Sequence, residues 1–187
     1  MKIHPTTLNS AYLITLNIFS DNRGFFARTY CRSEFEKHEL SSHFEQCSIS
    51  FNHKKGTLRG MHFQKNPHAE TKLVRCSRGK IFDVLIDLRP DSSTFAQWEG
   101  HILSGENRHM LYIPEGFAHG FQTLEDNTEV FYQISNSYVP SHASGVRWND
   151  PAFSINWPLE VTVISEKDQT FPDFNPLDFA RSPVTLS

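Results

Sequence analysis

The sequence predicts an all-β fold of the sandwich or jelly-roll type, in one domain that spans residues 1–187. Between about residues 44 and 140, short strand-like runs recur at regular spacing, separated by turns that contain glycine and proline. Sixteen phenylalanines are many for a chain of 187 residues, and aromatic side chains favour strands. Helix-like segments are too few for an α/β fold.

Turn signals mark the ends of the predicted elements. The predicted strands are Lys80–Leu88, Trp98–Leu103, Met110–Ile113 and Glu129–Ser135. They stop at groups such as Arg89-Pro90-Asp91 and Pro114-Glu115-Gly116, whose composition is typical of turns. Ser33–Leu40 is the best candidate for a short helix. The tail from Asn149 is rich in proline, aspartate and aromatic residues, which predicts irregular packing against the barrel.

The composition excludes several classes of partner. A net charge of −3 gives no basic footprint for a nucleic acid. No apolar window of about 18 residues is present, so no membrane span is expected, and Met1–Pro5 starts no hydrophobic signal region. The three cysteines, Cys31, Cys47 and Cys76, match no metal-ligand spacing, and we interpret them as free thiols. A cytoplasmic location is therefore expected.

The segment Leu58–Gln64 places a histidine beside glycine and an aromatic residue inside strand-like sequence. Strand alternation puts Gly60 and His62 on one face and Arg59 on the other, unless a bulge intervenes. Glycine inside a strand often marks close approach of a ligand or of another backbone. Lys72 lies on the next strand-like run, Thr71–Val74. Taken alone, His62 fits a structural histidine and Lys72 a surface lysine, but their shared context favours a pocket.

A second segment, Ile113–Phe121, contains the pattern P-x-G-x-x-H that ends at His119. The pattern resembles the second motif of the cupin superfamily of β-barrels. Metal-binding cupins pair it with an H-x-H that this chain lacks, and a metal needs at least three convergent ligands. We therefore expect no metal, and expect His119 to donate a hydrogen bond to an anionic ligand.

Two tyrosines, Tyr132 and Tyr138, stand six residues apart and share a strand face if the strand runs that far. A phenol can donate a proton to carbon, or it can simply line a barrel. Together with the two histidine segments they predict a pocket with a base, a lysine and an arginine. Such a pocket suits proton abstraction next to a carbonyl on a negatively charged substrate.

The order and spacing of several segments make a resemblance specific. The chain resembles the dTDP-4-dehydrorhamnose 3,5-epimerase family, cupin enzymes that act on nucleoside-diphosphate 4-keto-6-deoxysugars. The matching segments are Asp21–Phe26, Gly56–Gln64, Lys72–Arg75, Gly79–Arg89, Leu103–Phe121, Trp148–Pro151 and Ser165–Asp168. They cover nearly the whole chain, and the resemblance implies a cupin jelly roll with a few short helices.

The resemblance also implies a mechanism and a role in making cell-surface carbohydrate. Members of the family convert dTDP-4-dehydro-6-deoxy-D-glucose to dTDP-4-dehydro-L-rhamnose by inverting C3 and C5 through an enolate. On this resemblance His62 is the base, Asp168 orients its imidazole, Lys72 stabilises the enolate oxygen and Tyr132 reprotonates carbon. No cofactor is required, because the ketone of the substrate is the electron sink.

Further positions match the substrate-contacting residues of the family. The resemblance assigns substrate binding to Arg23, Arg28, Gln46, Ser48, Arg59, His119, Tyr138, Ala143 and Lys167. Arg23 would reach the site of the partner subunit, which implies a homodimer. Ser48 stands where the family usually has asparagine. Arg28 replaces an acidic residue and Ala143 a glutamate, both at the nucleotide end of the site, so the residues leave nucleotide and sugar identity open.

Other functions remain open on the sequence alone. A C3-only epimerase or a ketoisomerase on a different nucleotide sugar would keep the same base and lysine. A sugar-nucleotide-binding cupin without catalysis is a second alternative, although it would have no need of His62, Lys72, Tyr132 and Asp168 together. A metal-dependent cupin oxygenase or isomerase is a third, and the missing H-x-H counts against it.

Overall fold

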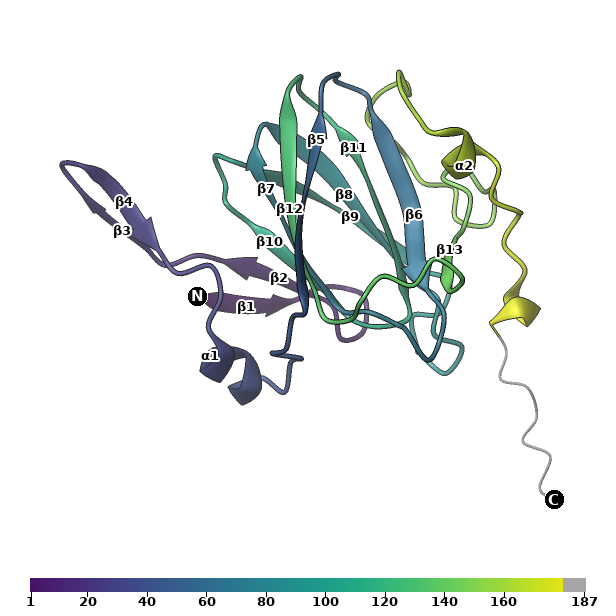
Figure 1. Cartoon of the computed structure of the whole chain (residues 1–187), viewed down its shortest axis with the longest axis horizontal. Coiled ribbons are helices and arrows are strands. Elements are labelled where there is room, and N and C mark those ends of the chain that lie inside the picture. The colour runs from purple at the N-terminus through teal and green to yellow at the C-terminus, as the bar shows by residue number, and fades with distance from the viewer. Residues whose placement is uncertain (180–187) are drawn as a thin grey trace.

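A computed structural model of the chain describes residues 1–179, which form a sandwich of two antiparallel sheets with a projecting hairpin (Figure 1). One sheet has the strand order β1-β2-β10-β7-β12-β5 and the other β13-β6-β11-β8-β9. Strands β3 and β4 pair only with each other. The predicted all-β jelly-roll class is therefore confirmed. Within these residues no helix is long and apolar enough to cross a membrane.

The elements have the following bounds. The six-stranded sheet consists of β1 (Lys2–Pro5), β2 (Tyr12–Thr15), β10 (Met110–Ile113), β7 (Lys72–Arg78), β12 (Thr128–Ile134) and β5 (Gln46–Asn52). The five-stranded sheet consists of β13 (Ala143–Gly145), β6 (Leu58–Gln64), β11 (Phe117–Thr123), β8 (Lys80–Asp87) and β9 (Trp98–Ser104). The remaining elements are the hairpin strands β3 (Ile18–Asp21) and β4 (Gly24–Ala27), the helices α1 (Arg32–Lys37) and α2 (Glu166–Gln169), and a 3-10 turn at Pro176–Asp178.

The predicted elements agree with these bounds closely, except for the helix. The predicted strand Met110–Ile113 is confirmed without change. The predictions for β8 and β9 differ by one residue at the C-terminal end, and the prediction for β12 is shifted by one residue at both ends. Helix α1 stops at Lys37, three residues before the predicted end. The chain leaves the helix because Glu39 adopts a left-handed conformation (φ 58°), and the Leu40 N–H donates back to the Phe35 carbonyl. That hydrogen bond closes a helix end of the Schellman type.

The core lies between the sheets, and a second apolar layer lies outside the five-stranded one. Val74 and Val130 on the inner face of the first sheet are buried with Leu85 and Phe121 of the second. On the outer side, aromatic residues of the C-terminal tail pack against Met61 and neighbouring side chains. The tail thus has little regular structure and covers a sheet, as its composition predicts.

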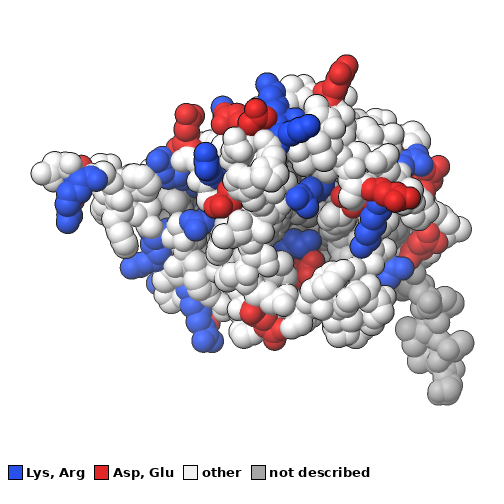
Figure 2. All heavy atoms as spheres, turned by 45° about the horizontal axis from the view of Figure 1, so that its top comes forward, with Lys and Arg blue, Asp and Glu red and all other residues white. Residues whose placement is uncertain are grey.

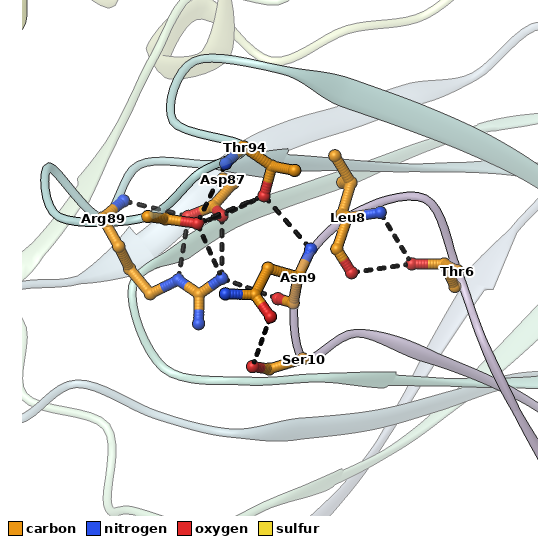
Figure 3. A network of polar contacts seen from close by, with 8 residues as sticks. Thr6, Leu8, Asn9, Ser10, Asp87, Arg89 and Thr94 are labelled. Carbon is orange, nitrogen blue, oxygen red and sulfur yellow. Dashed lines mark hydrogen bonds and ion pairs between the residues drawn. The ribbon is translucent and has the colours of Figure 1, made fainter.

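A buried carboxylate ties the N-terminal turn to the end of β8 (Figure 3). Asp87 is fully buried and accepts hydrogen bonds from Arg89, Ser92 and Thr94 at 2.5–3.0 Å. Burial favours its neutral form, but these donors hold the pKa of Asp87 below its ordinary value. Arg89 also donates to the Asn9 carbonyl at 2.6 Å. The network fixes β8, and β8 supports β11 at the centre of its sheet.

Strands β6 and β11 approach each other unusually closely at two glycines. Gly60 has φ +138°, and a Cβ atom built on it would lie 2.5 Å from the Cα of Gly120. The register pairs His62 with His119 and Arg59 with Phe121, so three steps along β6 match two along β11. This is a β-bulge, which breaks strict alternation. As a result Arg59 and His62 face the same cavity, whereas regular alternation places them on opposite faces.

The glycine contact gives a stability prediction with a matched control. We expect Gly60→Ala to lower the free energy of unfolding by about 1–3 kcal/mol more than Gly24→Ala, because overpacking adds to backbone strain. Gly24 has a similar φ of +134° but no atom within 4 Å of the added Cβ. Urea unfolding at one protein concentration measures both. Equal losses would show that the β6–β11 contact imposes no steric limit.

Candidate active site

A cavity of about 370 Å³ opens between the β5 edge of one sheet and the β6–β13 edge of the other. Figure 2 shows basic side chains on the face turned forward, several of them around a central hollow. Of the candidates from the sequence, the residues that line the cavity are Gln46, Ser48, Arg59, His62, Lys72, His119, Tyr132, Tyr138, Ala143 and Lys167. The fold thus gathers residues from six strands and α2 into one site.

His62 forms a dyad with Asp168, which stands behind it on α2. The His62 Nε2 lies 2.7 Å from Asp168 Oδ1, and the Gly60 N–H donates to Oδ2 at 3.1 Å. Ser165 caps α2 by accepting from the Asp168 N–H at 3.1 Å. The carboxylate is buried and the imidazole is 41% exposed. With Nε2 directed at Asp168, Nδ1 is the nitrogen free to take a proton.

The charge state of Asp168 follows from its surroundings. Burial favours the neutral acid, but the hydrogen bond and charge of His62 and the donors at Gly60 and Ser165 outweigh it. The pKa of Asp168 is therefore held below its ordinary value. A carboxylate that stays ionised stabilises an imidazolium and fixes the ring orientation.

Tyr132 reaches the cavity from β12, in the sheet opposite to that of His62. Burial, with a contribution from the Asp83 charge, raises the pKa of Tyr132 well above its ordinary value, although Arg59 opposes the shift. The phenol therefore keeps its proton over the working pH range. Its ring stands edge-on to His119, with ring centroids 6.0 Å apart. A base and a protonated phenol thus approach the cavity from opposing sheets.

His119 belongs to a second histidine–carboxylate pair. Its Nε2 lies 2.7 Å from Asp83 Oδ1, and both side chains are buried. Only Nδ1 is therefore available for the anionic ligand that the sequence predicts. Asp83 was missed by sequence reasoning, although a carboxylate within the apolar run of β8 is itself a signal, because buried aspartates are usually paired.

Sequence reasoning also missed two residues, Asn52 and Glu70, each of which holds a predicted site residue in position. Asn52, buried on β5, accepts from the Arg59 Nε at 2.7 Å and so directs the guanidinium along the cavity wall. Glu70 forms an ion pair with Lys72, with 3.0 Å between Oε1 and Nζ. Residues two apart in extended chain share a face, so the spacing of Glu70 and Lys72 is the signal that was available.

The loop after β12 places Tyr138 differently from the sequence expectation. Strand β12 ends at Ile134, so Tyr138 does not extend the strand face of Tyr132. Gln46 accepts from the Tyr138 N–H at 3.2 Å and holds the loop over the cavity. Tyr138 is 56% exposed and still lines the site, but it does so from the loop.

Two predicted substrate contacts do not line the cavity of their own chain. Arg23 stands between β3 and β4, is 85% exposed, and pairs with Asp21 at 2.5 Å. Arg28 follows β4 and lies 3.7 Å from Glu34. Across residues 1–179, no group of three or more His, Cys, Asp or Glu side chains is arranged to hold a metal.

Comparison with known proteins assigns the family. The family model for dTDP-4-dehydrorhamnose 3,5-epimerase matches residues 5–176. The chain belongs to this family. It is 42% identical to the epimerase of that name from Salmonella typhimurium, over 92% of this chain and 94% of the relative. It is 43% identical to the one from Methanothermobacter thermautotrophicus, over 89% and 90%. Family membership makes the chain an isomerase of the 3,5-epimerase type.

Solved structures of related epimerases have the same fold. The Bacillus anthracis epimerase, solved with TDP and PPi bound, has a TM-score of 0.90 at 43% identity, over 92% of this chain and 99% of that one. The Legionella pneumophila epimerase, in complex with dTDP-4-keto-L-rhamnose, has a TM-score of 0.84 at 37% identity, over 89% of each. A 3'-monoepimerase from Streptomyces bikiniensis is 28% identical with a TM-score of 0.85, over 91% and 86%.

The lowered pKa of Asp168 predicts how its stabilisation depends on pH. We expect Asp168→Asn to lower the free energy of unfolding by about 1–3 kcal/mol at neutral pH, through weakened hydrogen bonds to His62 and Gly60. Unfolded aspartate has a pKa of about 3.9, so the difference is full above about pH 5. It shrinks as pH falls through the lower folded-state pKa. Urea unfolding across this pH range measures it.

A surface aspartate provides the control for this experiment. Asp173 is 68% exposed and pairs with Arg147, so Asp173→Asn should cost less than about 1 kcal/mol at any pH. If the difference between wild type and Asp168→Asn stayed constant down to about pH 3, the ionised form of Asp168 would not be what stabilises the fold.

Proposed function

We propose that His62 and Tyr132 invert C3 and C5 of dTDP-4-dehydro-6-deoxy-D-glucose from opposite faces of the sugar. The observation that carries the proposal is the dyad of His62 and Asp168 in one sheet, opposed across the cavity by Tyr132 in the other. Base and acid must stand on opposite faces for a carbon to be inverted. The product is dTDP-4-dehydro-L-rhamnose, the rhamnose precursor for cell-surface polysaccharide.

Each inversion proceeds in two proton transfers. His62 Nδ1 takes the proton from C3 or C5, and the electron pair of the broken C–H bond moves into the C4 carbonyl to give an enolate. The Lys72 ammonium stabilises the enolate oxygen. Tyr132 then gives its phenolic proton to the opposite face of the carbon as the ketone reforms. Solvent exchange returns both residues to their starting protonation states. The ketone is the electron sink, so the scheme needs no cofactor.

The basic side chains of the cavity support a diphosphate at the same site. Arg59, His119 and Lys167 line it together, and Lys167 lies over the Phe171 ring at 6.0 Å. The Bacillus anthracis relative was solved with TDP and PPi bound. The two departures, Arg28 and Ala143, are separate from the proposed acid–base residues. Ala143 leaves a methyl group on the cavity wall, and Arg28 pairs with Glu34 outside it.

Inversion of both carbons is favoured over the C3-only alternative. The chain is 42–43% identical to 3,5-epimerases over about nine-tenths of its length, and 28% identical to the 3'-monoepimerase. A binding protein without catalysis would not need the ionised Asp168 behind His62 or the protonated phenol of Tyr132. Free thiols at Cys31, Cys47 and Cys76 support a cytoplasmic location.

We also propose a homodimer in which Arg23 completes the site of the partner. The hairpin projects from the sandwich (Figure 1) and exposes Phe19 (68%) and Phe26 (70%). Ile49 on β5 and the Ile18 side chain are also exposed. Large exposed apolar patches usually mark protein contacts. Arg23 near the hairpin tip is then in position to reach the partner's nucleotide.

Replacement of the base and of the acid should have different effects in D₂O. We expect His62→Ala to lower both epimerisation and deuterium uptake at C3 and C5 by about 10²–10⁴-fold, because no base remains. Tyr132→Phe should retain uptake at a substantial fraction of the wild-type rate but lose inversion. NMR of the substrate measures both rates. His38→Ala, which changes an exposed histidine outside the cavity, is the control. Undiminished inversion in His62→Ala would refute the base assignment.

A mixing experiment tests whether Arg23 acts across a dimer. Arg23→Ala should be impaired at low substrate concentration and His62→Ala inactive. A mixed dimer then has one intact site, with His62 from one chain and Arg23 from the other. Random reassociation of equal amounts should restore about a quarter of wild-type activity, because half of the dimers are mixed. If Arg23 serves its own chain, the mixture should gain no activity.

A further inference from the structure

Glu70 and Lys72 form an enclosed ion pair on the cavity wall. Glu70 precedes β7 and Lys72 is its first residue, so the two side chains project to the same side. The side chains are each 10% exposed, and both residues line the cavity. Lys72 Nζ lies 3.0 Å from Glu70 Oε1. The carboxylate therefore contacts the residue to which the proposed function gives the enolate oxygen.

Gln64 anchors the other oxygen of this carboxylate. Its Nε2 donates to Glu70 Oε2 at 2.8 Å, and also lies 3.1 Å from the carbonyl oxygens of His68 and Ser137. Its Oε1 accepts from the Val139 N–H at 2.7 Å. Gln64 is buried on β6, two residues after His62. Glu70 is thus fixed to the strand of the base and to the loop that carries Tyr138.

The ion pair between Glu70 and Lys72 stabilises both the charge and the position of Lys72, which the proposed mechanism requires. An enclosed ammonium without a counter-charge favours its neutral form, and a neutral amine cannot offer a full positive charge to an enolate. Lysine also has a long flexible side chain, so an unanchored Lys72 would lose entropy each time it met the substrate. A fixed carboxylate at 3.0 Å removes both difficulties before the substrate binds.

We propose that Glu70 is a positioning residue of the epimerase, which holds the Lys72 ammonium in place for the enolate oxygen. The proposal rests on the proposed function of the site. Glu70 acts through Lys72 and exchanges no proton with the sugar. Its contribution should therefore be to the rate of enolate formation, with little effect on substrate affinity.

The main test is Glu70→Gln, a substitution of nearly the same shape. The amide oxygen can still accept from Gln64, but the side chain carries no charge for Lys72. We expect kcat to fall by about 10- to 100-fold, while KM changes by less than about threefold. Glu125→Gln is the matched control, because Glu125 pairs with Lys80 at 3.3 Å on the surface. It should leave both constants unchanged. Wild-type kcat in Glu70→Gln would overturn the proposal.

A double-mutant cycle separates positioning from a general structural effect. With Lys72→Met in place, adding Glu70→Gln should change kcat no further, because the group that Glu70 positions is gone. Losses that multiply would overturn the proposal. Glu70→Asp, which keeps the charge, should retain more activity than Glu70→Gln. If Glu70→Gln folds poorly, the activity of Glu70→Asp still tests the proposal. Less activity in Glu70→Asp than in a folded Glu70→Gln would also contradict it.

The same data distinguish failure of this proposal from failure of the proposed function. If Lys72→Met has wild-type kcat, the enolate role of Lys72 is wrong and the role of Glu70 is overturned with it. If Lys72→Met is impaired but Glu70→Gln is not, the proposed function stands and the role of Glu70 alone is overturned.

Discussion

The close contact between β6 and β11 at Gly60 and Gly120 is the constraint on which the site depends. No side chain fits between the two backbones at this point. The contact accompanies a bulge that brings Arg59 and His62 to one side, and it sets His62 directly beside His119. The Gly60 N–H also binds Asp168, so the glycine that permits the close approach helps to fix the carboxylate behind the base.

Around this contact, three side chains of the cavity that can carry positive charge each pair with a carboxylate. His62 pairs with Asp168, His119 with Asp83, and Lys72 with Glu70. Removing charges from water is costly, and buried ion pairs often add little net stability. Their concentration in one cavity is therefore better explained by chemistry than by folding, since acid–base reactions need groups with fixed orientation and protonation state. The sandwich supplies that fixation through strands whose own positions are held by networks such as that of Asp87.

The hairpin shows that the aromatic content of the chain serves two purposes. Phe35 and Phe121 are fully buried, as expected for a protein of this composition. Phe19, Phe25 and Phe26 are exposed on a two-stranded ribbon that no other strand of residues 1–179 joins. A ribbon of this kind is marginal in water without packing. The dimer we propose would bury its apolar faces and place Arg23 where the nucleotide ends.

The sequence by itself determined the fold class and placed four strands to within one residue at each end, because turns and alternation depend on neighbouring residues. It also indicated His62, Lys72 and His119 through local motifs. The predicted helix was too long by the three residues from His38 to Leu40, because the chain ends the helix with a left-handed residue that composition does not signal. Asp168 came from family resemblance, since 106 residues separate it from His62. The bulge at Arg59, the pairing of His119 with Asp83 and the anchoring of Glu70 by Gln64 were decided by tertiary structure. The bulge and the His119–Asp83 pair depend on register and packing between strands distant in sequence. Gln64 and Glu70 lie only six residues apart, but Gln64 is itself held by the distant loop at Ser137 and Val139. Short-range sterics do not fix such contacts.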